Sequence, residues 1–282
     1  PLKTKITWFG HSAFMVEMDG KVLLLDPMFG QAATPHPWVG SKRYNSTFPV
    51  AIDDLPNIDI VIFSHDHYDH LDYGSVKKLK DKVDHWLVPW GLDNHLVKWG
   101  VDADRITSLD WWQETVQHDI EFVFTPARHF SGRGITDRFE TLWGSWVIKG
   151  ATERIYFSGD SGYGSHFKKI GEQYGPFDIG LMECGQYNHK WADIHMMPEQ
   201  TVQAAIDVQA KIMMPIHWGA FTLAVHSWIE PVQRASIEAQ RLGMKMTTPK
   251  IGEQIIINET YPSSRWWIDY LETPINTNKT KE

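Results

Sequence analysis

The residues with the most distinctive chemistry lie between positions 65 and 70, where the chain reads His-Asp-His-Tyr-Asp-His. Three imidazoles and two carboxylates within six residues form the donor set that zinc and similar divalent metals prefer. The apolar run 58–63 precedes them and predicts a buried β-strand. Because a strand that ends in a loop directs the side chains that follow toward one point, this segment predicts a metal site.

The same arrangement, a short β-rich run followed by a metal-binding residue, recurs three times downstream. The run 120–126 leads to His129, the run 154–159 to Asp160, and the run 211–216 to His217. Each residue alone also fits an ordinary role, as a loop histidine, a turn aspartate or a buried hydrogen-bonded histidine. Together they predict ligands held at the ends of several strands of one scaffold, as a preorganised site requires.

Hydrophobic periodicity and turn residues predict the elements that position these groups. Three strands joined by tight turns open the chain, with an Asp-Gly hairpin at 19–20. They are expected at 6–9, 13–18 and 22–25, and helices at 73–82, 92–99, 164–174, 198–208 and 228–242. Between the third strand and the metal segment, residues 28–55 are rich in Pro, Gly and aromatic residues, and loops of that length usually have a function.

Composition and charge narrow the classes of partner. The formal net charge of −8 argues against nucleic acid, which requires a basic face. No apolar run is long enough to cross a bilayer, although peripheral contact with a membrane stays open and fourteen tryptophans fit either a lipid interface or core packing. We therefore expect a cytoplasmic or membrane-peripheral protein. Because the chain begins with Pro1 and a targeting segment can be removed, a periplasmic location also stays open. The oligomeric state is not determined.

The single cysteine, Cys184, excludes an intramolecular disulfide and a cysteine-rich zinc site. It stands in the apolar run 179–184, which favours a packed thiol over a nucleophile.

These motifs resemble those of the metallo-β-lactamase superfamily of binuclear hydrolases. The His-x-His-x-Asp-His segment and the separate downstream His, Asp and His carry the resemblance, which extends from about Ile6 to Pro231. Further stretches are similar to the branch that contains the N-acylphosphatidylethanolamine-hydrolysing phospholipases D and their bacterial relatives. These stretches are 8–12, 26–27, 64–72, 142–146, 159–163 and 216–219.

The resemblance implies an α/β fold of four layers, an αββα sandwich in which two β-rich halves pack face to face with helices outside. Because the predicted ligands span residues 65 to 217, no division between them leaves a working site, so we expect one domain over 1–272. The polar end, 273–282, is expected to be disordered.

The resemblance also implies two Zn²⁺ ions, although Mn²⁺ or Fe²⁺ also suits the donors. One ion takes His65, His67 and His129, the other takes Asp69, His70 and His217, and Asp160 bridges them. Two zinc ions, two carboxylates and a bridging hydroxide would leave a charge near +1, which favours an anionic ester. In this scheme Asp69 also orients the nucleophilic water, and Asp66 supports a ligand or the backbone.

Four further residues are candidates for substrate contact. His195 matches a family histidine near the reacting group, where it binds a phosphate oxygen or protonates the leaving alkoxide; an ordinary loop histidine is the alternative. His11 contacts substrate or supports the metals from behind. Arg133 binds a substrate anion or pairs with a nearby carboxylate. Trp38, in the aromatic segment 28–55, contacts an apolar part of the substrate.

The resemblance thus predicts a binuclear zinc phosphodiesterase of phospholipase D type, acting on N-acylphosphatidylethanolamine-like lipids. A lactonase or other carboxylic-ester hydrolase on the same metal site is the alternative enzyme. A metal-binding scaffold without turnover is a third hypothesis, and the complete ligand set argues against it.

Overall fold

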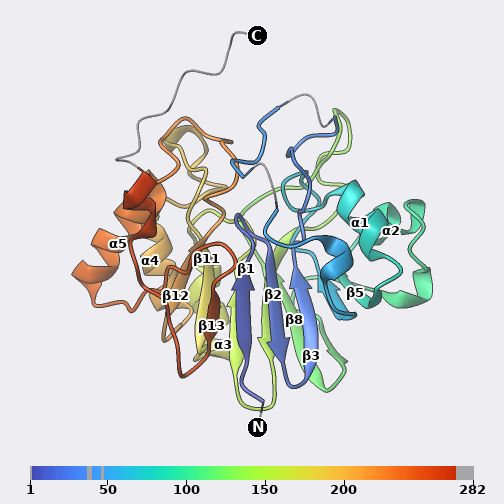
Figure 1. The fold of residues 1–282 in the computed structure, drawn as a ribbon, viewed down its shortest axis with the longest axis horizontal. Helices are drawn as coiled ribbons and strands as arrows, with labels where there is room; N and C mark the ends of the chain where they lie inside the picture. The colour runs from blue at the N-terminus through green and yellow to red at the C-terminus, as the bar shows by residue number, and fades with distance from the viewer. Residues whose placement is uncertain (1, 37–39, 46–47, 271–282) are drawn as a thin grey trace.

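The computed structural model describes residues 2–36, 40–45 and 48–270. The fold consists of two β-sheets packed face to face, with helices on their outer surfaces (Figure 1). The first sheet has the order β13-β1-β2-β3-β4-β5-β6, and the second has the order β12-β11-β10-β9-β8-β7. This is the expected αββα sandwich. Trp38 and residues 271–282 lie outside the described residues, so the predictions for Trp38 and for the polar end 273–282 stay predictions.

The strands of the first sheet are β1 (Lys5–Trp8), β2 (Phe14–Met18), β3 (Lys21–Leu25), β4 (Ile58–Ile62), β5 (Val83–Pro89), β6 (Ile106–Leu109) and β13 (Gln254–Ile256). Those of the second sheet are β7 (Glu114–Gln117), β8 (Ile120–Pro126), β9 (Gly144–Lys149), β10 (Arg154–Phe157), β11 (Ile179–Glu183) and β12 (Met213–Ile216). The helices are α1 (Tyr73–Leu79), α2 (Asp93–Lys98), α3 (His166–Tyr174), α4 (Pro198–Asp207) and α5 (Glu230–Leu242).

The opening hairpin forms as its sequence predicts. Asp19 and Gly20 have φ values of 52° and 77°, the left-handed conformation that a two-residue hairpin turn requires. All five predicted helices are present, each shorter than expected by one to three residues. Helix α5 ends at Gly243, which adopts a left-handed φ of 71° and caps the helix.

Three apolar layers stabilise this arrangement. The largest lies between the sheets and includes Trp8, Phe14, Phe124 and Trp146, each at most 1% exposed. The other two lie under α1 and α2 on one side and under α3, α4 and α5 on the other. Each large side chain buried in this way contributes roughly 1.5–3 kcal/mol. The indole of Trp146 also donates a 2.8 Å hydrogen bond to the Phe63 carbonyl, which ties the second sheet to the end of β4.

Strand direction gathers the predicted ligands. Strands β3 to β6 are parallel to one another, and so are β10 to β12. Strand β8 is antiparallel to β9, and β9 to β10, so β8 runs in the same direction as β10. The Gly144 amide, at the start of β9 and beside the end of β8, donates to the Ser64 carbonyl just after β4, so the loops that follow β4, β8, β10 and β12 meet at one end of the sandwich.

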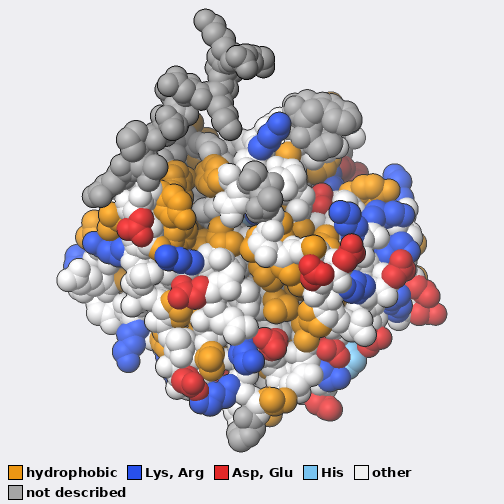
Figure 2. All heavy atoms as spheres, in the orientation of Figure 1, with side chains coloured by type: hydrophobic (Ala, Val, Ile, Leu, Met, Phe, Trp, Pro, Cys, Tyr) orange, Lys and Arg blue, Asp and Glu red, His pale blue; other side chains and the backbone are white. Residues whose placement is uncertain are grey.

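The distribution of charged side chains on the surface agrees with the net negative charge of the chain. Figure 2 shows acidic and basic side chains mixed over the face it draws, without a continuous basic area among the coloured residues. Cys184 is buried, as expected. Among the residues that the structure describes, no helix has the length and apolar character needed to span a membrane.

Candidate metal centre

Asp26 and Ser64 hold the metal loop, residues 65–70 after β4, in place by hydrogen bonds. Asp26 Oδ1 accepts a 2.7 Å hydrogen bond from the Ser64 amide, and Oδ2 accepts one of 2.5 Å from the Ser64 hydroxyl. Asp26 Oδ2 also lies 2.6 Å from His70 Nδ1, and the Ser64 hydroxyl lies 2.9 Å from His65 Nδ1. Both rings are held by Nδ1, which leaves Nε2 for the interior of the site. Asp26 was not among the predicted site residues.

Three histidines form the first cluster. His67 Nδ1 lies 3.0 Å from His65 Nε2 and 3.1 Å from His129 Nε2. His129 Nδ1 donates to the Ile194 carbonyl at 3.0 Å, which orients Nε2 toward the other rings. Burial lowers the pKa of all three imidazoles, well below the usual range for His65 and His129. They are therefore neutral near pH 7, the form in which imidazole binds a metal.

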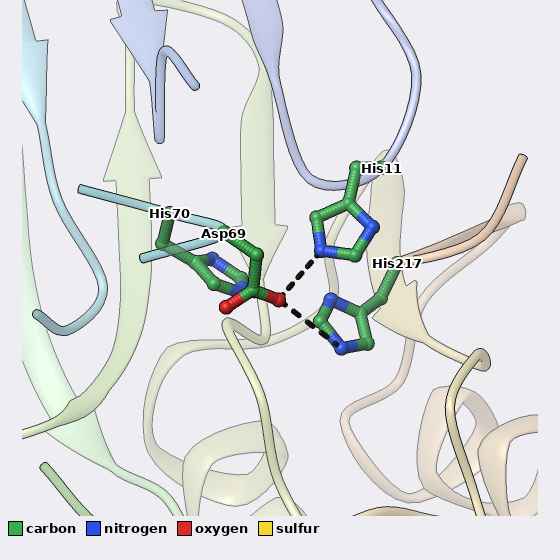
Figure 3. Close-up of side chains that lie close together, drawn as sticks. All are labelled: His11, Asp69, His70 and His217. Carbon is green, nitrogen blue, oxygen red and sulfur yellow. Dashed lines mark hydrogen bonds and ion pairs between the residues drawn. The ribbon is translucent and has the colours of Figure 1, made fainter. Parts of the chain in front are cut away.

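The second cluster contains Asp69, His70 and His217, joined by His11 (Figure 3). Asp69 Oδ2 lies 2.7 Å from His11 Nε2, 3.4 Å from His70 Nε2 and 3.9 Å from His217 Nε2. The loops of His11 and His217 pair through their backbones, since the His11 amide donates to the Trp218 carbonyl and the His217 amide to that of His11. His11 therefore belongs to the cluster, in contact with a predicted ligand.

Asp160 lies between the two clusters. Its Oδ2 atom is 3.2 Å from His70 Nε2, 3.7 Å from His65 Nε2 and 3.8 Å from His129 Nε2. Its Oδ1 atom is 3.2 Å from His217 Nδ1. Although burial opposes ionisation, the nearby histidines His217 and His70 hold the pKa of Asp160 well below its usual range. The carboxylate is therefore ionised and contacts donors of both clusters.

Close backbone approach allows this arrangement. Gly159, just before Asp160, has a φ of 55°, and a Cβ there would lie 2.5 Å from the Gly144 carbonyl oxygen. Left-handed φ values also occur at Asp26, His11 and His217, at 38°, 56° and 66°. Such conformations cost energy in residues other than glycine and are concentrated at functional sites.

Two buried atoms support a metal as the missing partner. Among the described residues, the buried atoms His70 Nε2 and Asp160 Oδ1 make no hydrogen bond of suitable geometry, although each lies 3.2 Å from a polar atom of a neighbouring His or Asp side chain. Leaving such atoms unsatisfied costs about 1–3 kcal/mol each. Both point into a group of nitrogen and oxygen donors whose types suit zinc. The His/Asp clusters are thus able to hold metal ions.

Residues of both clusters form the floor of a cavity of about 340 Å³, the metal cavity. Its walls add apolar side chains to the polar floor, namely Phe130, Trp191, Ile194 and Leu223. His195 also lines the cavity, with its ring centre 5.1 Å from that of His129 and 5.3 Å from that of His217. A molecule bound in this cavity therefore lies near His195.

His195 is paired with Glu183, a residue to which the sequence analysis gave no role. His195 Nδ1 lies 3.1 Å from Glu183 Oε1. Burial raises the pKa of Glu183 to about 7, and the hydrogen bond from His195 opposes that shift. Although burial acts against it, the same hydrogen bond raises the pKa of His195. A signal was present in the sequence, because Glu183 is the single acidic residue within the apolar run 179–184.

Asp66 and Arg133 brace the metal loop. Asp66 Oδ1 accepts a 2.8 Å hydrogen bond from the Gly132 amide, and Oδ2 accepts one of 3.1 Å from Thr141. The Arg133 guanidinium donates to the carbonyls of Asp66 and Leu71, at 2.5 and 2.7 Å. Arg133 thus joins the segment after β8 to the metal loop, and its contact with substrate stays a prediction.

The comparisons with known proteins agree with this geometry. A family model described as a beta-lactamase superfamily domain matches residues 21–218. The chain belongs to the metallo-β-lactamase superfamily. It is accordingly a metal-dependent hydrolase, and the fold and the His/Asp clusters match that class.

Relatives and solved structures extend the comparison. An uncharacterised protein of Mycobacterium tuberculosis is 42% identical over 266 residues, covering 93% of this chain and 71% of the relative. The N-acyl-phosphatidylethanolamine-hydrolyzing phospholipase D 1 of Caenorhabditis elegans is 35% identical over 238 residues, covering 80% of this chain and 67% of the relative. An isothiocyanate hydrolase from Delia radicum gut bacteria shares the fold, with a TM-score of 0.70, 18% identity and coverage of 92% of this chain and 100% of that one.

Proposed function

We propose that this protein is a binuclear zinc phosphodiesterase of phospholipase D type, acting on N-acylphosphatidylethanolamine-like lipids. The observation that carries the proposal is the position of Asp160, whose carboxylate contacts histidines of both donor clusters. A carboxylate shared in this way suits two ions better than one closed site, which needs about four ligands. The similarity to the nematode phospholipase D supports the substrate class.

The ligand sets follow from the clusters. His65, His67 and His129 would hold one ion, Asp69, His70 and His217 the other, with Asp160 contacting both. Zinc supplies Lewis-acid chemistry, which generates a nucleophile from water near neutral pH and stabilises developing negative charge on a phosphoryl group.

The side chains around the clusters have separate tasks. Asp69, held by His11 at 2.7 Å, can accept a proton from an attacking water and orient that water. His195 lines the approach to the clusters and can bind a phosphoryl oxygen or donate a proton to the departing alkoxide. Asp26 and Ser64 hold two of the rings in place, so the donors need not reorganise when a substrate binds.

A second cavity supports a substrate with acyl chains. It has a volume of about 500 Å³, and Tyr44, Trp228, Ile251, Trp266 and Tyr270 line it together with Lys250. A small void of about 10 Å³ shares lining residues with both cavities. Tyr44 and Trp228 line the void and the second cavity, and Gln186 lines the void and the metal cavity. The second cavity is therefore our candidate site for an acyl chain.

The test is a substrate screen of zinc-reconstituted protein with metal content measured alongside. We expect close to two equivalents of zinc per chain and hydrolysis of N-acylphosphatidylethanolamine in mixed micelles. No more than one equivalent in a folded preparation would rule out the binuclear model. A kcat/KM for a simple lactone more than about a hundredfold above that for every phosphodiester, a difference of some 2.7 kcal/mol, would favour the carboxylic-ester alternative.

A further inference from the structure

Glu183 is a fully buried carboxylate that lies beside the metal cavity but outside both donor clusters of the proposed ligand set. It is the last residue of β11, and its side chain has no exposed surface. Burying an ionisable group is unfavourable unless specific hydrogen bonds compensate. The buried carboxylate of Glu183 therefore requires specific hydrogen-bond partners.

Hydrogen bonds fix Glu183 from three directions. Its amide donates to the Ser158 hydroxyl at 2.9 Å, and its carbonyl accepts from the Thr201 hydroxyl at 2.7 Å. Carboxylate Oε2 accepts from the Met196 amide at 3.0 Å, just before α4. Because the backbone and Oε2 of Glu183 are held by hydrogen bonds, the position of Oε1 is fixed as well.

That second oxygen, Oε1, faces Nδ1 of His195 at 3.1 Å. Above about pH 7, where Glu183 is ionised, its carboxylate only accepts hydrogen bonds, so Nδ1 of His195 carries the hydrogen and the neutral ring has its lone pair on Nε2. A ring nitrogen of His195 also lies within 4.8 Å of donor atoms of His129 and Asp160. One edge of the ring is thus held by Glu183 while the ring lines the metal cavity.

We propose that Glu183 is a positioning residue, which holds His195 by Nδ1 and so directs Nε2 toward the substrate in the metal cavity. The kinetic part of this inference rests on the proposed function, because it requires a reaction in which His195 takes part. The structural part, the orientation and tautomer of His195, does not depend on which ester is hydrolysed.

Glu183→Gln is the informative substitution, because glutamine has one acceptor oxygen where glutamate has two. If that oxygen keeps the Met196 amide, the amide NH₂ faces His195 and donates to Nδ1. The ring hydrogen must then move to Nε2. The variant keeps the side-chain shape and removes a buried charge, so we expect it to fold.

The first measurement is the ¹⁵N NMR spectrum of the imidazoles, with His195 assigned by comparison with His195→Ala, in both zinc-loaded and chelator-treated protein. We expect the hydrogen on Nδ1 in the parent and on Nε2 in Glu183→Gln. A parent ring with its hydrogen on Nε2 would overturn the proposal without any variant, and so would an unchanged tautomer in Glu183→Gln.

The second measurement is a double-mutant cycle that combines Glu183→Gln with His195→Ala. The substrate is a diester with an alkoxide leaving group, or whichever ester the substrate screen shows to be hydrolysed. Glu183→Gln should keep its zinc, lower kcat by roughly 10- to 100-fold with little change in KM, and have no further effect in a His195→Ala background. Thr248→Val, which removes a buried threonine hydrogen bond to the Ser264 carbonyl and leaves the hydrogen bonds of Glu183 in place, is the matched control and should change kcat by less than about threefold.

Three kinetic outcomes would contradict the proposal. These are an equal loss in the His195→Ala background, loss of zinc from Glu183→Gln, or a loss in Thr248→Val as large as that in Glu183→Gln. If phosphodiesters are not hydrolysed but the tautomer changes as expected, the proposed substrate class fails and the positioning role of Glu183 stands.

Discussion

Asp26 Oδ2 lies 2.6 Å from Nδ1 of His70, although 44 residues separate the two in the chain. Both side chains are fully buried. Although burial acts in the opposite direction, the carboxylates of Asp160, Asp69 and Asp26 raise the pKa of His70 well above its usual value. A carboxylate behind a ligand histidine fixes its ring and increases its basicity, and such partners affect metal affinity strongly.

Asp26→Asn should therefore weaken metal binding while the fold survives. Asparagine offers one acceptor to the three donors that Asp26 now serves, the Ser64 amide, the Ser64 hydroxyl and His70. We expect the affinity for one zinc equivalent to fall by roughly 10- to 100-fold, measured by competition with a chelator. Asp59→Asn, at the opposite end of β4, is the control and should leave zinc affinity unchanged. Equal zinc affinity in Asp26→Asn and the parent would show that Asp26 serves only the fold.

Asp160→Asn should fold but lose activity. The substitution removes one negative charge from between the clusters without opening a cavity, so the metal ions lose a shared ligand while the packing stays intact. We expect kcat/KM to fall far more than tenfold, with unchanged circular dichroism. Asp178→Asn, which changes a largely buried aspartate just before β11, is the control for the chemistry of the substitution. Activity within about tenfold of the parent would exclude Asp160 from the site.

The clustering of these His and Asp side chains could be predicted from sequence because its signal is local. Residues 65–70 hold four of the seven donors in one loop, and His129, Asp160 and His217 each follow closely on a strand with strong β character. The supporting residues gave no local signal of this kind. Asp26 and Glu183 act through single hydrogen bonds to histidines 44 and 12 residues away, and only the folded chain brings those atoms together.

The limits of the fold prediction have a similar cause. Strands β5, β6, β7, β9, β11 and β13 were not predicted. Strand β11 is buried along its whole length and lacks the period of two that marks a half-exposed strand, and β6, β7 and β13 have only four, four and three residues. The aromatic segment 28–55 was expected to contact an apolar part of the substrate through Trp38. The structure divides it, since Phe29 and Phe48 pack against Phe9 in the core while Tyr44 lines the second cavity.

Trp228→Ala tests the second cavity as a site for acyl chains. The indole lines that cavity. Its removal should leave about two methylene groups of a long acyl chain unburied, which weakens binding of the chain by roughly 1.6 kcal/mol. We expect kcat/KM to fall about tenfold for a long-chain N-acylphosphatidylethanolamine and to change little for a short-chain soluble diester. Trp90→Ala, an exposed tryptophan that does not line this cavity, is the matched control. Equal losses in the two variants would assign the effect to general contact with lipid.

His195→Ala should keep both metal ions and lower kcat by roughly 10² to 10⁴, the usual range for loss of a general acid. His195 stands outside the predicted ligands, is held by Glu183 at Nδ1 and lines the cavity above the clusters. The loss should be much smaller on a bis(4-nitrophenyl) phosphate, because a nitrophenolate departs without a proton, whereas an alkoxide requires one. Comparison of kcat on the two diesters, with zinc content measured in the same preparations, separates the possible roles. An equal loss on both substrates would leave binding of a phosphoryl oxygen as the role of His195, and loss of a zinc ion would place His195 among the ligands.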